Sequence, residues 1–329
     1  MIIGWSKISI TPSNTEKVDL VGQSYSRQST GVQSDLFATV CVVENIAIVS
    51  IDAISVPSAL TRDIDKTKFG LSNIIYCATH THEAPRVTIG IGYYSLLKSS
   101  IERAIETAIK TSEPGCKISF GYQSAVTGRV RRVKMFEIPE TTRDLVNTYA
   151  SSTKNTVLYY DTQRSPEKFE GLSGDTNCLI NSLYTFNSNN ELTGIMANVP
   201  CPAQCLEHST LISADYWSIV REQINEHFGK EIYVLPLCGA SGDNSPHFVV
   251  NRKQEERRHE KLYGTSYDYS HSTADQTRAM CEMKDIGTTI TNTLLSIYDW
   301  AKTDTIDVNE IEYQNIQVNV DVNYIDSDA

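Results

Sequence analysis

The stretch that most constrains the fold of this chain is Ile74–Arg86, which reads IIYCATHTHEAPR. It opens with β-branched and aromatic residues, a pattern typical of a buried strand, and Pro85 ends it. Side chains alternate across an extended strand, so His80 and His82 are expected on one face, ~7 Å apart. Two imidazoles at a strand end can share a metal or divide labour as ligand and proton donor. For an isolated pair, one core histidine and one solvated histidine is the more common outcome.

Strand and helix patterns alternate around this stretch. The segment Ala38–Asp52 predicts two buried strands joined by a turn at Glu44 and Asn45. Apolar spacing then predicts a helix at Ser55–Lys68 and a second helix at Tyr93–Thr111, on either side of the histidine strand. This order predicts an α/β fold in which a layered mixed β-sheet is flanked by helices.

The rest of the chain continues the same pattern. Further strands are predicted at residues 2–12, Lys117–Val126, Cys178–Phe186, Glu191–Val199, Glu231–Leu237 and Ile311–Val322. Helices are predicted at Ser213–His227 and Cys281–Trp300, and the charged segment Asn251–His271 is either a solvated helix with a loop or a flap. No repeat and no Pro/Gly/Ser linker divides the chain, so residues 1–329 are expected to form a single domain.

Charge and composition narrow the classes of partner. The formal net charge of -11 argues against nucleic acid or an anionic membrane as a general partner and favours small or neutral substrates. No apolar run approaches the ~20 residues of a membrane span. The chain is therefore expected to be soluble and cytoplasmic as written, or secreted or periplasmic if a signal peptide was removed. Most of the eight cysteines lie in apolar, strand-like runs, which suits reduced thiols.

Three further stretches combine residue types that carry chemistry. Cys201 lies between two prolines, which fix its position rigidly enough for a ligand or nucleophile, although a small buried thiol is equally consistent. The turn Cys238–His247 follows a buried strand, where α/β sheets place their sites, but its residues also suit any tight turn. The cluster Arg129, Arg131 and Arg132 could hold a carboxylate or an oxyanion, or could be a solvated strand end.

Taken together and in order, four segments resemble the neutral/alkaline non-lysosomal ceramidase family. They are Gly4–Pro12 (GWSKISITP), Ala78–Pro85 (ATHTHEAP), Thr210–Asp215 (TLISAD) and Gly242–Pro246 (GDNSP). The likeness spans nearly the whole chain and implies the fold of a ceramidase catalytic domain. It also implies a zinc-dependent amidohydrolase that cleaves an N-acyl bond in a lipid or small-molecule amide, as ceramidases do in lipid metabolism.

The resemblance assigns roles to particular residues. His80 would be a zinc ligand, and His82 would face the scissile carbonyl and stabilise its oxyanion. Ser245 would correspond to the serine of the catalytic loop, and Arg131 to the family's arginine near the site, within one residue. Bound zinc lowers the pKa of its water toward ~7, and neighbouring donors stabilise the tetrahedral intermediate.

The sequence differs from the family pattern at two places where the family has metal ligands. The position of the family's second metal histidine falls on Cys201, so a thiolate would replace an imidazole, and His208 is an alternative ligand. The family's later Glu and Tyr ligands have no matching motif before Ala329. The chain is therefore expected either to be truncated at its C-terminus or to have a rebuilt site.

Two other functions compete with the metal-dependent hydrolase. In one, Cys201 is a thiol nucleophile activated by His82 or His208, with no metal. In the other, the chain is a non-catalytic, ceramidase-like binding protein whose contact surface is the charged segment Asn251–His271.

Overall fold

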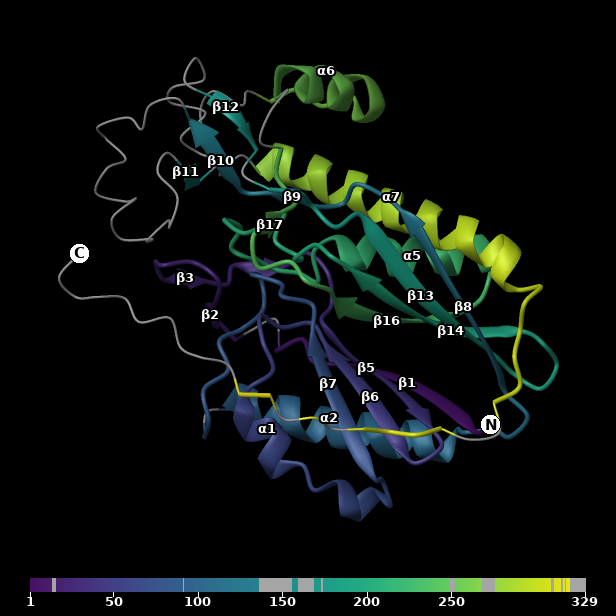
Figure 1. Ribbon diagram of the computed structural model, residues 1–329. Coiled ribbons are helices and arrows are strands. Elements are labelled where there is room, and N and C mark those ends of the chain that lie inside the picture. Colours follow the sequence, from purple (N-terminus) through teal and green to yellow (C-terminus); the bar gives the residue numbers. More distant parts are fainter. Residues whose placement is uncertain are drawn as a thin grey trace.

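Two β-sheets pack face to face, and helices cover their outer faces (Figure 1). The computed structural model describes residues 1–13, 16–90, 92–135, 156–158, 169–172, 174–248, 252–267, 276–308, 311–314, 316 and 318–319. Each sheet buries one face against the other sheet and one against helices, which gives a layered core. The prediction of a mixed α/β fold in layers is confirmed.

The first sheet has the strand order β1-β5-β6-β7. Its strands are β1 (Ile3–Ser9), β5 (Phe37–Val43), β6 (Ile46–Ile51) and β7 (Asn73–Ala78). The strands β5 and β6 form the predicted hairpin, and β7 runs parallel to β6. The outer face is covered by α2 (Gly92–Lys110), whose buried stripe includes Leu97, Ile101 and Ile105 at helical spacing.

The second sheet has the order β16-β14-β13-β8. Its strands are β8 (Lys117–Ser124), β13 (Leu179–Phe186), β14 (Leu192–Val199) and β16 (Tyr233–Cys238). The strands β13 and β14 form the second predicted hairpin, and β14 runs parallel to β16. Two helices cover the outer face, α5 (Tyr216–Phe228) and α7 (Gln276–Ala301) (Figure 1).

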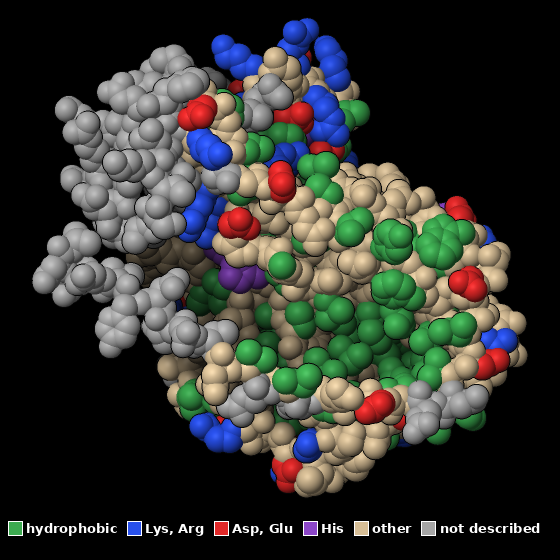
Figure 2. All heavy atoms as spheres, viewed as in Figure 1, with side chains coloured by type: hydrophobic (Ala, Val, Ile, Leu, Met, Phe, Trp, Pro, Cys, Tyr) green, Lys and Arg blue, Asp and Glu red, His purple; other side chains and the backbone are tan. Residues whose placement is uncertain are grey.

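Trp5 anchors the contact between the sheets. Its ring stacks on Tyr233 with centroids 5.7 Å apart, and its indole N–H donates to Thr185 Oγ1 at 3.0 Å. A Cβ on Gly194 would lie 2.4 Å from the same ring, so glycine lets β14 approach it. The sheets do not close completely on the side that faces the viewer in Figure 2, where hydrophobic side chains surround a hollow. Phe120 and Tyr122 of β8 are exposed.

Short elements complete the described chain. They are β2 (Asp19–Leu20), β3 (Arg27–Gln28), β4 (Gly31–Val32), β9 (Arg129–Val130), β10 (Arg132–Met135), β11 (Thr156–Leu158), β12 (Phe169–Leu172), β15 (Leu211–Ile212), β17 (Asn244–Ser245), α1 (Ser58–Asp63), a 3-10 helix η1 (Lys66–Phe69) and α6 (Arg252–Tyr263). Most of these strands pair in twos, and they connect the loops at one end of the sheets.

Three predicted elements differ from the structure. The predicted helix at Ser55–Lys68 is shorter and divides into α1 and η1, because Asp65 caps a new turn by accepting from Thr67 N–H. The charged segment Asn251–His271 contains the helix α6, and its residues 251 and 268–271 lie outside the described part. Residues 311–314, 316 and 318–319 form no strand, and the remainder of that predicted strand lies outside the described residues.

The cysteines and the helices agree with two further expectations. All eight cysteines are free thiols, in agreement with the expectation of reduced thiols. Among the described residues, no helix combines the length and the apolar character needed to cross a membrane.

Candidate functional site

The two histidines of the predicted strand lie in the turn that follows it. β7 ends at Ala78, and His80 has a left-handed backbone with φ of 63°. The strand alternation that predicted a shared face therefore does not apply. The turn still brings the rings together, with the centroids of His80 and His82 5.1 Å apart and the planes at 68°. His80 Nδ1 lies 2.8 Å from the Ile54 carbonyl oxygen, which can only accept, so Nδ1 carries the proton.

His82 is enclosed by its neighbours. Its side chain is buried, and neither ring nitrogen has a hydrogen-bond partner among the described residues. Gly22, with φ of 101°, lies so close that a Cβ there would come 2.3 Å from His82 Cγ. The carboxylate oxygen Glu207 Oε2 is 3.8 Å from His82 Nδ1. Burial lowers the pKa of His82 to about 4, although Glu207 opposes the shift, so the ring is neutral at neutral pH.

Three residues that the sequence analysis did not assign to the site form a chain of contacts behind His82. His247 Nδ1 lies 2.7 Å from Glu282 Oε2, and His247 Nε2 lies 3.1 Å from Glu207 Oε1. Burial by itself would lower the pKa of His247, but Glu282 and Glu207 raise it to about 9. Burial would raise the pKa of Glu207, but His247 above all lowers it to about 2. At neutral pH an imidazolium therefore lies between two carboxylates.

Sequence signals for these three residues differ in strength. His247 directly follows the Gly242–Pro246 motif, and Glu207 precedes His208, which the sequence analysis did consider. A search for acid–base residues beside each motif would have found both. Glu282 lies on the covering helix α7, where the apolar spacing gives no functional signal.

The predicted arginine cluster and the Gly242–Pro246 loop lie against each other. β9 pairs antiparallel with β17, with Ser245 opposite Arg129. The guanidinium of Arg131 donates to the Gly242 carbonyl at 2.9 Å. Ser245 Oγ accepts from the backbone N–H of His247 at 3.2 Å. His247 thus connects the loop that carries Ser245, and to which Arg131 binds, to Glu207, and through Glu207 to His82.

Cys201 and His208 make other contacts. The Cys201 thiol is buried and donates to the Thr127 carbonyl at 3.2 Å, and burial raises its pKa well above the ordinary value. Its hydrogen bonds go to the carbonyl oxygens of Thr127 and Pro202 rather than to His80 or His82. His208 Nδ1 is 2.7 Å from the Tyr25 hydroxyl, and its Nε2 is 3.7 Å from Glu207 Oε1. The structure therefore places His208, rather than Cys201, beside the chain of acid–base contacts.

Arg27 joins the segments that surround His82. This buried guanidinium donates to the carbonyl oxygens of Val21, His82 and Ser209, each at 2.6 Å. Three carbonyl acceptors on one cation form charge-assisted hydrogen bonds, which are stronger than neutral ones. Arg27 thus fixes the position of the His82 backbone relative to two loops that are distant in sequence.

Gly22→Ala is expected to displace the His82 ring. The positive φ costs an alanine roughly 1–2 kcal/mol, and overpacking against the ring adds about 1–3 kcal/mol. Gly70→Ala is the matched control, because Gly70 has a φ of 69° and a Cβ at that position would meet no atom of the described residues within 4 Å. Denaturant unfolding should show the larger loss for Gly22→Ala, and the NMR resonances of the His82 ring should shift in that variant alone. Equal losses, with unchanged His82 resonances, would contradict the close packing.

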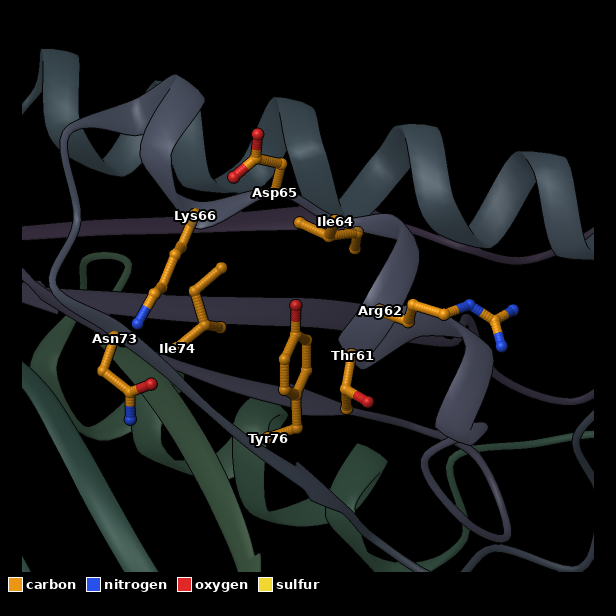
Figure 3. A pocket seen from close by; sticks show the side chains of 8 residues that line it. All are labelled: Thr61, Arg62, Ile64, Asp65, Lys66, Asn73, Ile74 and Tyr76. Carbon is orange, nitrogen blue, oxygen red and sulfur yellow. The ribbon is translucent and has the colours of Figure 1, made fainter. Parts of the chain in front are cut away.

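A separate cavity of about 410 Å³ lies beside the outer face of β7 (Figure 3). It is lined by Thr61, Arg62, Ile64, Asp65, Lys66, Asn73, Ile74 and Tyr76. None of these is a predicted site residue, so the histidine site and this cavity are different places.

Comparison with known proteins gives one consistent result. No family model matches the chain, and no curated protein matches it. Among solved structures, the neutral ceramidase from Pseudomonas aeruginosa superposes with a TM-score of 0.63 and 17% identity over 91% of this chain. A ceramidase complexed with C2 superposes with a TM-score of 0.60 and 15% identity over 91% of this chain. The chain has a ceramidase-like fold. It spans 45% and 44% of those two chains, and at these identities the likeness concerns the fold alone.

Among the residues of the site, His80 is suited to be one ligand of a zinc ion. Because His80 Nδ1 donates to a backbone carbonyl, its Nε2 carries the lone pair, the arrangement typical of metal-bound histidine. Within the described parts of the chain, no group of three His, Cys, Asp or Glu side chains could hold a metal ion. The described residues therefore do not make up a complete zinc site.

Proposed function

We propose that this chain is a hydrolase of N-acyl amide bonds. The observation that carries the proposal is the convergence of two loops that follow β7 and β16, on a ceramidase-like fold. One loop carries His80 and His82, and the other carries Ser245, with Arg131 bound beside it. The imidazoles are linked through Glu207 and His247 to the loop that carries the hydroxyl and binds the guanidinium. These groups suit acyl transfer, which needs proton movement and stabilisation of an oxyanion.

His82, Arg131 and Ser245 each have a separate role in the proposed reaction. His82 lies next to the acyl carbonyl, because its Nε2 is buried and has no partner among the described residues. Arg131 Nε is also buried, without a hydrogen-bond partner in the described part of the chain, and supplies a donor for a developing negative charge. Ser245, on β17, orients the substrate between the two loops. The substrate class is a small-molecule or lipid amide.

The proposed hydrolase also depends on zinc. His80 Nε2 would hold the ion, and further ligands would come from outside the described residues. When bound, zinc would supply a polarised water of lowered pKa. The protein's own residues bind the amide and place its carbonyl against His82.

The test combines hydrolysis with metal content. Purified without added zinc or chelator, the protein is expected to hold about one zinc per chain by plasma mass spectrometry, if a single site of this type is present. His80→Ala is expected to lose that metal and to slow hydrolysis of N-acylated amines by about a hundredfold or more. The control is His227→Ala in the last turn of α5, where the ring packs edge-on against Phe228. An unaltered rate in a folded His80→Ala variant would overturn the proposal.

The competing functions give other results in the same experiment. A thiol nucleophile would be insensitive to chelators and inactivated by an alkylating agent, but the burial and raised pKa of Cys201 do not favour it. A ceramidase-like binding protein would hold no metal and turn over no amide.

A further inference from the structure

We propose that the hollow between the two sheets is a docking site for a segment of this same chain, residues 316–324, which binds there in an extended conformation. Two features carry the inference. One is an apolar hollow bordered by an open strand edge, and the other is a segment whose side chains alternate as such an edge requires. The inference does not depend on the proposed function.

The inner face of β8 forms one wall of the hollow. A Cβ on Gly121 would lie 2.3 Å from Ile297 Cγ2, so the odd-numbered positions of β8 face the helix α7. Side chains alternate along a strand, and Phe120 and Tyr122 therefore face inward, toward the first sheet. They are nevertheless 55% and 61% exposed. Two neighbouring aromatic side chains this exposed on an inward face indicate a surface that another segment covers.

The edge strand β7 forms the facing wall. Ile74 and Tyr76 pack against the apolar cluster under α2, so Ile75 and Cys77 point the other way, toward the second sheet. The Cys77 sulfur accepts from the backbone N–H of Cys238 at 3.4 Å, which places β16 directly on this face. Ile75 is exposed. Because β16 and β8 are the two opposite edges of the second sheet, the sheets touch at β16 and stand apart at β8.

The backbone of β8 is open along the same border. Ile118 exchanges two backbone hydrogen bonds with Ile306, of 3.2 and 2.8 Å, on the side away from β13. Alternate residues of an antiparallel strand direct their backbone groups to the same side, so those of Phe120 and Tyr122 also point outward. No described residue forms a backbone hydrogen bond with them there. An open edge of this kind is a template for an added extended segment.

Segment 316–324 has the pattern that fits this edge. It reads IQVNVDVNY, with an apolar side chain at every second position and a polar one between. A period of two is typical of an extended segment that buries one face. The first two apolar side chains, Ile316 and Val318, are 75% and 72% exposed. Docking would remove them from water and, by the same pattern, leave the polar side chains outside.

The segment is close enough to reach the hollow of its own chain. Phe120 and Tyr122 lie about 7 and 13 Å along β8 from Ile118, at ~3.3 Å per residue. Residues 307–315 connect Ile306 to the segment, and a chain of that length spans roughly 15–18 Å even as a random coil. A connection that matches the distance gives an effective concentration in the millimolar range. This favours the chain's own segment over that of a second copy.

Hydrogen exchange of the full chain, read by mass spectrometry, tests the docking from both sides. In the wild type, segment 316–324 and the outer amides of β8 are expected to exchange about tenfold or more slowly than an unstructured peptide. Val318→Asp/Val320→Asp places charges on the apolar side of the segment and should remove the protection at β8. Phe120→Asp, at an exposed position, should in turn remove the protection of segment 316–324. Each variant is thus read at a place distant in sequence from its own substitution.

The matched control is Gln317→Asp/Asn319→Asp, which adds the same two charges at the alternate positions of the segment. It should leave the protection at β8 unchanged, because these side chains face away from the hollow. Exchange of segment 316–324 at the rate of an unstructured peptide overturns the proposal. Unchanged exchange at β8 in Val318→Asp/Val320→Asp overturns it as well.

A second copy of the chain is the other occupant that these data distinguish. Docking within one chain requires a monomer by light scattering and the same protection after dilution by about a hundredfold. Protection that decreases on dilution, together with a dimer, would place the segment in the hollow of a second copy and overturn docking within one chain. None of these measurements needs turnover, so a failure to hydrolyse amides would refute the proposed function and leave the docking untouched.

Discussion

Asp52→Asn is expected to destabilise the protein by about 3–5 kcal/mol, because it leaves a buried guanidinium without its counter-ion. Asp52 follows β6 and is fully buried, and its carboxylate binds Arg221 of α5 through two hydrogen bonds of 2.7 and 3.0 Å. It also accepts from the Phe37 backbone N–H at 2.8 Å. The pair thus joins the first sheet to a helix that covers the second sheet. Denaturant unfolding of the purified variant measures the loss.

An exposed pair provides the control for this prediction. Arg258 and Asp285 form a similar two-bond pair, but their side chains are 43% and 17% exposed. Asp285→Asn is therefore expected to cost at most about 1 kcal/mol. The double variant Asp52→Asn/Arg221→Met should recover part of the loss, since it removes the unpaired charge. A loss for Asp52→Asn as small as that for Asp285→Asn would show that the buried pair contributes little.

The elements of the core could be predicted from local patterns. The hairpin at Ala38–Asp52 is confirmed by β5 and β6, and the turn at Glu44 adopts a φ of 53°. The helix predicted at Tyr93–Thr111 is α2, displaced by one residue at each end. These segments have a strong period of two or of 3.6, and burial of one face supports the same structure that the pattern favours. The face-to-face packing of two sheets depends on long-range contacts such as that of Trp5 with Tyr233, which no local pattern encodes.

The site was predictable only in part, for a related reason. His80 and His82 were found because they are neighbours in sequence, although their rings meet through a left-handed turn and not through strand alternation. Glu282 comes from a helix 200 residues further along the chain from His82 and contacts His247 at the site. A single carboxylate on an amphipathic helix is usually solvated, so its burial could be known only from the folded structure.

His247 is expected to make the stability of the protein fall between about pH 6.5 and 9. Its pKa is raised from an unfolded value of about 6.5 to about 9 by Glu282 and Glu207, despite burial. The imidazolium therefore contributes its full stabilisation below pH 6.5, and the contribution disappears as the pH rises through 9. The difference in pKa corresponds to about 3 kcal/mol. Other charged or titratable groups that act on this cluster are His82, His208, Asp215 and Arg278.

Unfolding curves at several pH values between 6.5 and 7.5 test this prediction, a range that stays about one unit below the pKa of unfolded cysteines, ~8.5. His247→Gln should be less stable at pH 6.5, because two buried carboxylates lose the cation between them, and it should lose the dependence on pH. Glu282→Gln should weaken the same dependence, since one of the two carboxylates is gone. His227→Gln is the control, because its ring packs against Phe228 and not against a carboxylate. If His247→Gln keeps the wild-type dependence of stability on pH, the imidazolium of His247 does not stabilise this cluster. The contacts from Glu282 to His82 would then not depend on a positive charge at His247.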